Sequence, residues 1–305
     1  MMGRVVIWIK AMRAPFFAAS AMSVVVGSAA AWWPGMLPVS LGHFVLALVG
    51  VVALHVGANL TNDYFDHMSG NDEANPHYGP FSGGSRMIQA GLIPAKRIFN
   101  AAMVLFAVGG VCGIAVWVDV GGWWIPAIGM AGLVTGYLYT APSSRLVYRG
   151  LGEVIVAVTF GPLATMGAYA VQGTTVRAEG FWCGAPVGLL VMLILLVNEV
   201  PDYEADKAAG KKTLVVRMGR TGAVVLIGFL YALVYATTGF IVGKHFAPAG
   251  AMWTFVTLPA AAFTVWWLWR NRESPMRLRV SSAAGIATHL AYAVILAAAY
   301  LAARR

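Results

Sequence analysis

The sequence predicts an all-α, polytopic membrane protein with about nine transmembrane helices, and three observations lead to that fold class. Of the 305 residues, 59% are apolar and only 11% are charged, whereas about a quarter of the residues of a soluble domain are charged. The mean hydropathy is +0.73, and windows of about 20 apolar residues, each long enough to cross roughly 30 Å of hydrocarbon, recur along the chain. Basic residues gather in alternate loops, which is typical of a chain threaded through a bilayer.

The spans follow one another with short polar connections. The first comes after a basic N-terminal region that would suit a signal peptide, but its apolar run is too long and further runs of the same character follow. The second ends in the polar stretch NLTNDYFD, the "YTAPSSR" turn separates the fourth from the fifth, and the sixth ends in "NEVPDYEADK". The nine spans are expected at about 14–33, 41–62, 97–118, 123–141, 153–172, 181–199, 221–243, 249–269 and 281–303.

The distribution of basic residues predicts the orientation. With nine spans, the N-terminus and the even-numbered loops share one side, which holds seventeen of the 21 Lys and Arg residues. The other side holds only Arg177, Lys244, Arg304 and Arg305. By the positive-inside rule the N-terminus is cytoplasmic, and we expect a multi-pass protein of the cytoplasmic (inner) membrane. Much of the net charge of +9 therefore orients the chain and does not indicate nucleic-acid binding.

Acidic residues show a second asymmetry, which the positive-inside rule does not require. All but Asp119 and Glu179 lie on the predicted cytoplasmic side, and they gather after spans two and six. At about 100° per residue, the first group occupies roughly a 100° arc of one helix face. Its members are Asn59, Asn62, Asp63 and Asp66.

The second acidic group repeats this pattern about 140 residues later. Asn198, Asp202 and Asp206 recur every four residues and share a face. Both groups end an even-numbered span, which predicts an internal duplication of a four-helix unit. We therefore expect one domain over 1–305, made of two pseudo-repeated halves at roughly 14–141 and 153–269 and a ninth helix at 281–303.

Clustered carboxylates repel one another and are costly to desolvate, so a cation usually accompanies them. Oxygen ligands without His or Cys at metal spacing favour Mg²⁺, which is commonly held by one or two carboxylates plus substrate phosphates. The two cysteines, Cys112 and Cys183, lie inside apolar spans and are expected to be buried thiols. Basic residues beside the acidic groups are suited to bind a Mg²⁺-bridged diphosphate. The alternative is that the acidic groups form a solvated face at the membrane edge. These basic residues are Lys207, Lys211, Lys212 and Arg217.

These motifs resemble those of the UbiA-type intramembrane prenyltransferases, which carry an N-D-x-x-D motif after the second helix and D-x-x-x-D after the sixth. Here the motifs read "NDYFDHMSGND" (62–72) and "DYEAD" (202–206). The likeness is greatest to the menaquinone-pathway branch, which attaches a polyprenyl chain to dihydroxynaphthoate. It is carried by 62–72, by "YTAPSSRLVYRGLGEVIVAVTFGPLATMGAYAVQG" (139–173) and by "NEVPDYEADKAAGKKTLVVRMGR" (198–220).

The resemblance implies a helical bundle around a central cavity and a Mg²⁺-dependent transfer of a polyprenyl group from an allylic polyprenyl diphosphate to an aromatic acceptor. Ionisation of the donor leaves an allylic carbocation that an electron-rich ring carbon attacks, and the metal stabilises the leaving group. The most similar branch points to 1,4-dihydroxy-2-naphthoate. Hydroxybenzoate, homogentisate, a chlorophyll precursor or a glycerol-phosphate lipid remain alternative acceptors.

Carried over position by position, the resemblance implies roles for specific residues. The metal ligands are expected to be Asp63, Asp66, Asp202 and Asp206. Substrate contacts are expected from Asn59, Asn62, Asn198, Lys207, Lys211, Arg217, Arg13, Arg86, Arg145 and Glu153. Tyr139 is expected to face the carbocation, which the negative face of its ring would stabilise. The alternative is that Tyr139 is an aromatic residue of the membrane interface. The parts of Asp72, His55 and Lys212 stay open, as do the prenyl chain length and the oligomeric state.

The chain departs from the family pattern at two places. "SGGSR" (82–86) stands where many quinone-pathway relatives have an Asp-Arg-Pro segment, and Glu199 and Pro201 replace an expected Asn and Arg. Both departures concern the acceptor more than the diphosphate. A transporter is the competing class, because polar residues and a repeat also occur there. Both acidic groups, however, lie at one membrane edge, whereas transporter sites usually lie near the midplane.

Overall fold

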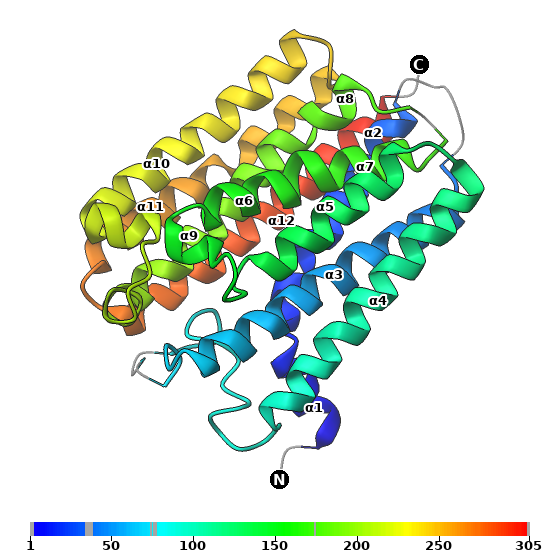
Figure 1. The fold of residues 1–305 in the computed structure, drawn as a ribbon. Helices are drawn as coiled ribbons and strands as arrows, with labels where there is room; N and C mark the ends of the chain where they lie inside the picture. The colour runs from blue at the N-terminus through cyan, green and yellow to red at the C-terminus, as the bar shows by residue number, and fades with distance from the viewer. Residues whose placement is uncertain (1–2, 34–38, 74, 76–77, 174, 304–305) are drawn as a thin grey trace.

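The computed structural model describes residues 3–33, 39–73, 75, 78–173 and 175–303. Within these ranges the chain forms a bundle of helices without a strand, so the all-α prediction is confirmed (Figure 1). The basic C-terminal pair Arg304 and Arg305 lies outside the described residues.

The predicted N-terminal half contains a short first helix, a 3-10 turn and four longer helices. These are α1 (Arg4–Ala11), η1 (Ala14–Phe16), α2 (Phe17–Trp32), α3 (Leu41–Met68), α4 (Ala95–Val120) and α5 (Trp124–Leu138). The remainder is more broken. It contains η2 (Leu146–Arg149), α6 (Gly152–Val158), η3 (Thr159–Leu163), α7 (Ala164–Ala170), α8 (Ala178–Trp182), α9 (Gly184–Ala208), α10 (Leu214–Gly243), η4 (Ala249–Thr257), α11 (Leu258–Asn271), η5 (Pro275–Leu278) and α12 (Arg279–Ala302).

Eight helical segments of the described chain are long and apolar enough to cross a membrane. The fourth predicted span, 123–141, contains α5, whose 15 residues reach only about 22 Å, so the count of nine stays a prediction. Large apolar side chains cover the outside of the bundle; Val118, Trp123 and Trp253 are 75–80% exposed. Such a surface suits lipid and not water, as expected for a multi-pass membrane protein.

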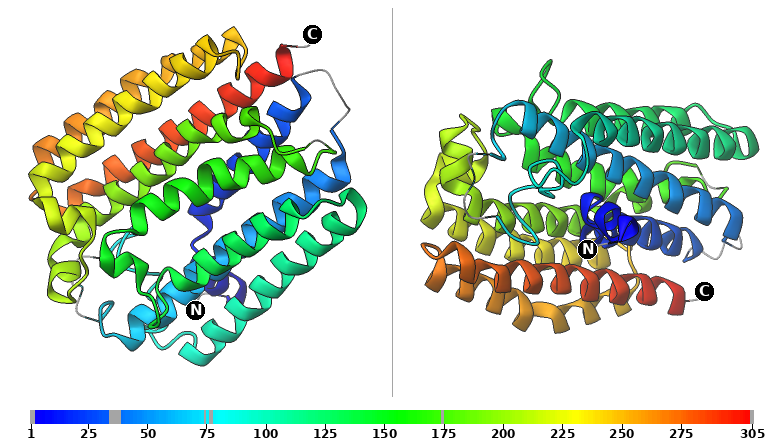
Figure 2. Two further views of the ribbon diagram at one scale, coloured as in Figure 1. Left: turned by 45° about the horizontal axis from the view of Figure 1, so that its top comes forward. Right: turned by 90° about the horizontal axis from the view of Figure 1, so that it is seen from below.

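The helices lie side by side, with α9 in the interior. α3 packs on α4 at one side of the bundle, α10 and α11 lie at the other side, and α9 and α12 lie between them (Figure 2). α9 is the most buried of the described helices of membrane-spanning length. Its apolar residues join those of α10 and α12 in the largest hydrophobic core. The second acidic motif is therefore carried on the most buried of these helices.

α3 is longer than the predicted span 41–62. It begins after Ser40, whose hydroxyl accepts a hydrogen bond from the amide of His43, and continues to Met68. The first acidic motif is thus helical and does not form a loop after the span. Carboxylates near a helix C-terminus oppose the macrodipole, but here Arg13 and Lys211 form ion pairs with Asp63 and Asp66.

The fifth predicted span is interrupted by a π-helical turn, η3. Gly161 has non-helical backbone angles, and Pro162 lacks an amide to donate. The carbonyl of Phe160 accepts a hydrogen bond from the Ser23 hydroxyl of α2. Such turns often mark functional sites, and this one directs residues of η3 towards the cavity described below.

Glycines allow α6, η3 and α9 to approach closely. A Cβ on Gly188 would lie 2.1 Å from the carbonyl oxygen of Ala157, and one on Gly184 would lie 2.0 Å from the hydroxyl of Thr165. Gly161 itself lies against Gly184 and Gly188. Small residues at such crossings bring helix backbones together in membranes.

We expect Gly188→Ala to destabilise the protein, because the new methyl group collides with backbone that cannot rotate away. Overpacking of this kind costs about 1–3 kcal/mol or more. Gly110→Ala is the matched control, since a Cβ there meets nothing within 4 Å. In thermal unfolding in detergent, Gly188→Ala should lower the Tm by several degrees and Gly110→Ala should leave it unchanged or raise it. Equal Tm values for the two variants would contradict the close contact.

Candidate active site

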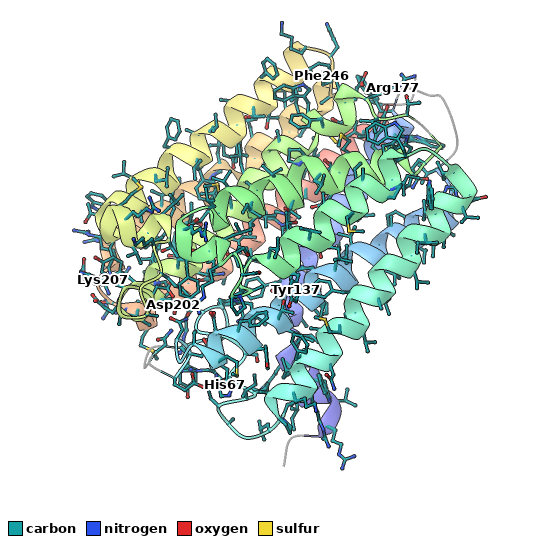
Figure 3. All side chains as sticks on the ribbon, viewed as in Figure 1. His67, Tyr137, Arg177, Asp202, Lys207 and Phe246 are labelled. Atoms are coloured by element: carbon teal, nitrogen blue, oxygen red, sulfur yellow. The ribbon has the colours of Figure 1, made fainter. Side chains whose placement is uncertain are left out.

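A cavity of about 220 Å³ lies between the two predicted halves of the bundle. Its deep end is apolar and is lined by Ile155, Phe160, Val191, Ile194 and Leu195. Its mouth is polar, at the end of the bundle where Asp202, Lys207 and His67 are seen in Figure 3. Arg177 and Phe246 lie at the opposite end (Figure 3). The cavity therefore fits an amphiphile with an anionic head and an apolar tail.

Lys211 joins the two acidic motifs at this mouth. Its Nζ lies 3.0 Å from Oδ2 of Asp66 on α3 and 3.5 Å from Oδ1 of Asp206 on α9. All three side chains are buried. Burial alone lowers the pKa of Lys211, but the charges of Asp66 and Asp206 raise it more, so the pKa lies above its usual value. The site thus contains a fixed positive charge between two carboxylates.

Arg13 forms a second ion pair at the mouth, with Asp63. Asp63 also accepts a hydrogen bond from the Ser85 amide at 3.2 Å, and its carboxylate does not line the cavity. Arg13 stands at a left-handed turn between α1 and η1, with φ of 56°, and does line the cavity. The structure therefore places Asp63 behind the mouth and Arg13 in its wall.

The connection between α3 and α4 closes one side of the mouth. Asn75 and the amide of Gly83 donate to the two carboxylate oxygens of Asp202, at 2.9 and 3.0 Å. Arg86 does not face the cavity; it donates to the carbonyls of Asp72 and Asn75 and so braces this connection. The second acidic motif is thereby tied to the loop that follows the first.

Asp72 lies in the same connection, lines the cavity and is buried. Burial, and then the charges of Asp66 and Asp63, raise the pKa of its carboxyl to about 8. A Cβ on Gly84 would lie 2.5 Å from this carboxyl, and Gly84 has φ of 76°. A glycine is thus required beside Asp72 for both space and backbone conformation.

The predicted site residues divide into two groups. Besides Asp66, Asp202, Asp206, Lys211 and Arg13, the cavity is lined by Asn59, Asn62, Asn198, Tyr139, His55 and Asp72. The other predicted residues lie outside its lining. Lys207 is exposed with its Nζ 5.7 Å from the Tyr203 ring, and Arg145 is exposed over the Tyr148 ring. Arg217 donates to the carbonyls of Arg149 and of Lys212, whose side chain is exposed.

Glu153 is buried but also lies outside the lining. Its Oε1 accepts a hydrogen bond from the Leu214 amide at the start of α10. Several lining residues were not among the predicted site residues, although Asn71 stands within the first motif and Ser82, Gly83 and Gly84 stand within the SGGSR segment. These are Asn71, Asn75, Ser82, Gly83, Gly84, Thr213 and the aromatic residues Phe16, Phe81 and Phe160.

The donor atoms at the mouth fit a hard cation. They are carboxylate and amide oxygens, which Mg²⁺ prefers, and Oδ1 of Asn71 and Oδ1 of Asn198 have no hydrogen-bond partner within the described chain. Among the described residues, no three His, Cys, Asp or Glu side chains are grouped closely enough to hold a metal by themselves. This arrangement suits the mode in which one or two carboxylates and substrate phosphates share the ion.

The raised pKa of Asp72 predicts a pH-dependent stability. The pKa of this carboxyl is higher in the folded state than in the unfolded state, where it is about 3.9. The free energy of unfolding therefore falls as the pH rises between these two values, by about 1.4 kcal/mol per pH unit. We expect Asp72→Asn to raise the Tm in EDTA, by a margin that grows from pH 5 to pH 8 and then levels off.

Glu204→Gln, at a carboxylate that is 63% exposed and pairs with Arg220, is the control for this measurement. It should show no such growth of the difference in Tm. A gain at Asp72→Asn that is the same at every pH would contradict the assignment of the buried proton to Asp72.

The sequence matches the model of the UbiA prenyltransferase family over residues 20–283. The chain is 28% identical over 238 residues to the 1,4-dihydroxy-2-naphthoate octaprenyltransferase of Bacillus subtilis, with 78% of this chain and 73% of that protein covered. It is 28% identical over 300 residues to the 2-carboxy-1,4-naphthoquinone phytyltransferase of Synechocystis, with 96% and 92% covered.

The fold also matches that of a solved structure. A UbiA homolog from Archaeoglobus fulgidus, bound to DMAPP and Mg²⁺, superposes with a TM-score of 0.63 at 18% identity, over 95% of this chain and 99% of that one. The match supports the all-helical membrane fold. Since the family model covers most of the chain, the resemblance inferred from the two acidic motifs is confirmed, and this protein belongs to the UbiA prenyltransferase family.

Proposed function

We propose that the protein transfers a polyprenyl group, in a Mg²⁺-dependent reaction, from an allylic polyprenyl diphosphate to an aromatic ring, with 1,4-dihydroxy-2-naphthoate as the acceptor. The observation that carries this proposal is the contact of Lys211 with both Asp66 and Asp206 at the polar mouth of an apolar cavity. It brings the two motifs, 140 residues apart, to one place. There the two carboxylates would bind the metal of a diphosphate, and the ammonium would pair with the remaining negative charge of the diphosphate.

Donor binding follows from the two ends of the cavity. The diphosphate lies at the mouth, where Lys211 and Arg13 supply positive charge, and the prenyl tail lies along Val191, Ile194 and Leu195 of α9. Those apolar side chains exclude water from an allylic cation. Tyr139 lines the cavity between the two ends, and its ring can stabilise the cation electrostatically.

Asp66, Asp202 and Asp206 are the residues that would hold Mg²⁺, because their carboxylates line the mouth. The bound ion supplies Lewis-acid stabilisation of the diphosphate as it leaves. Asn62 orients Asp66 by donating to its Oδ2 at 3.0 Å, and Asn75 orients Asp202 at 2.9 Å. Asp63, which lies behind the mouth, holds Arg13 in place.

The named acceptor comes from the relatives, whose names refer to naphthoate or naphthoquinone rings. Those names differ in the prenyl group, which is octaprenyl in one and phytyl in the other. The remaining aromatic acceptors and glycerol-phosphate lipids are alternative outcomes of the assay below. A transporter is disfavoured because the acidic groups meet at one end of the bundle and not midway along the spans.

We further propose that the mouth faces the cytoplasm. Seventeen of the 21 Lys and Arg residues fall on that side in the nine-span topology, which is the side that the positive-inside rule assigns to the cytoplasm. A single cysteine introduced at exposed Lys207, in a background without Cys112 and Cys183, should react with a membrane-impermeant thiol reagent only in inside-out vesicles. Reaction in intact cells would indicate the opposite orientation and contradict this proposal.

Purified protein in detergent with Mg²⁺ and farnesyl diphosphate should consume 1,4-dihydroxy-2-naphthoate and release diphosphate, and EDTA should abolish both. The measurement is chromatography of the prenylated product together with a diphosphate assay. A panel of hydroxybenzoate, homogentisate and a glycerol-phosphate lipid tests the alternatives. Absence of Mg²⁺-dependent diphosphate release with every acceptor would refute the proposal.

Asp202→Asn should lower turnover at least about 100-fold, because it removes one carboxylate charge from the leaving-group site. The matched control is Glu204→Gln on the same helix, where the exposed side chain pairs with Arg220. That variant should retain wild-type turnover. Unchanged turnover in Asp202→Asn would remove Asp202 from the metal site.

A further inference from the structure

A second, apolar cavity of about 590 Å³ lies between α10 and α11, at one side of the bundle (Figure 2). Among the described residues, none lines both this cavity and the candidate active site. Its floor is formed by buried side chains, among them Val224, Tyr231 and Ala261. Phe229 on α10 and Trp266 on α11 form its rims and are 63% and 47% exposed. The cavity is therefore a groove in the outer surface of the bundle, which we call the α10–α11 groove.

The groove is about as long as one leaflet of a bilayer is deep. On α10 its lining runs from Val224 to Tyr235, and on α11 it runs from Leu258 to Trp269. Each stretch covers 11 residue steps, from 224 to 235 and from 258 to 269, which is about 16 Å of helix. Half of a hydrocarbon core of roughly 30 Å is about 15 Å. The groove therefore matches the depth of a single acyl chain.

Arginines stand at one end of the groove. Residues 270–279, which follow the last groove-lining residue of α11, contain four arginines and one glutamate. The guanidinium carbon of Arg270 lies 5.7 Å from the centroid of the Trp266 ring. The guanidinium carbon of Arg272 lies 4.8 Å from the centroid of the Trp269 ring. Both rings line the groove, so both positive charges lie at its opening.

Of these two arginines, Arg270 is the one that is available to a ligand. Glu273 pairs with Arg220 at 2.9 Å and lies 3.9 Å from Arg272. Arg272 also donates to the Thr221 hydroxyl at 3.2 Å and so ties the end of α11 to α10. Arg270 is exposed, and within the described chain it forms no ion pair. The opening of the groove thus carries an uncompensated guanidinium.

The arginine end of the groove lies at the same end of the bundle as the mouth of the active-site cavity. Arg220 pairs both with Glu273 and with Glu204 on α9, two residues before Asp206. The positive charges therefore lie at the membrane surface that carries the mouth, at the level of the headgroups of one leaflet. Tryptophan side chains are favoured at this level of a membrane.

A second copy of the chain complements this surface poorly. In a two-fold symmetric contact both copies use the same surface, and in one membrane both copies have the same orientation. The arginines at the end of α11 would then face their equivalents, and like charges at an interface repel one another. A ligand with a negative headgroup and an apolar chain complements both parts of the groove.

We propose that the α10–α11 groove binds an anionic phospholipid, with one acyl chain between the two helices and the phosphate at Arg270. Lipid tails are as apolar as the groove, so the chain is held by close van der Waals contact and not by exclusion of water. The preference for a negative headgroup comes from the guanidinium, which forms charge-assisted hydrogen bonds with phosphate. This site does not depend on the proposed transferase activity.

Native mass spectrometry of the detergent-purified protein, titrated with phosphatidylglycerol or phosphatidylcholine, tests the headgroup. We expect one molecule of phosphatidylglycerol to bind at least about fivefold more tightly than phosphatidylcholine, the effect of one basic side chain at a membrane surface. Arg270→Gln should remove this preference. Arg97→Gln, at an exposed arginine of α4 outside the groove, is the matched control and should keep it.

Ala232→Trp tests the position of the acyl chain. Ala232 lines the groove and is exposed, so a larger side chain occupies the groove without entering the core. We expect the affinity for phosphatidylglycerol to fall at least about tenfold, the effect of losing roughly ten heavy-atom contacts. Ala107→Trp, at an exposed alanine of α4 outside the groove, should bind the lipid like wild type. If Ala232→Trp does not fold, Ala262→Phe on the facing helix replaces it with the same expectation.

Equal affinity of the wild-type protein for the two lipids would overturn the proposal, as would unchanged binding of phosphatidylglycerol in the variant with the filled groove. An equal loss of binding in the two α4 controls would also overturn it, because the lipid would then adsorb without a defined site. A wild-type dimer that Ala232→Trp converts into a monomer would assign the groove to a second copy of the chain instead.

Discussion

The buried ammonium of Lys211 between Asp66 and Asp206 is the interaction on which the rest of the site depends. Two carboxylates from α3 and α9 cannot be desolvated together without a positive charge between them. That charge links α3 and α9 at one end of the bundle, at the mouth of the cavity. The two carboxylates are suited to a cation and the ammonium is suited to a diphosphate. The charges that hold the site together are therefore already arranged for both ligands.

Close packing of α6, η3 and α9 supplies the other constraint. The Gly161, Gly184 and Gly188 contacts bring the helices so near that no side chain fits between them. This contact directs η3 into the cavity wall. Polar chemistry at the mouth and apolar surface at depth therefore share one buried wall, α9. Such a wall helps a site that must exclude water from a cation.

Much of the fold and part of the site could be predicted from local patterns. Apolar run length located the spans because a bilayer requires it, and four-residue spacing placed Asp202 and Asp206 on one helix face. Proximity in sequence failed for Lys207 and Arg217, which lie near Asp206 along the chain but point away from the cavity. The π turn of η3 and the loop ligands Asn75 and Gly83 have no local signal, because their roles arise from contacts over more than 100 residues.

The sequence by itself determined the membrane class, the helical architecture, the two acidic motifs and the family, since each depends on composition or on spacing within one helix. Only the tertiary structure decided that Lys211, and not its neighbours, joins the motifs, that Asp63 is bound to Arg13 behind the mouth, and that Glu199 lines the cavity while Glu153 is buried outside its lining. Those outcomes depend on how helices distant in sequence pack, and helical periodicity does not encode that packing.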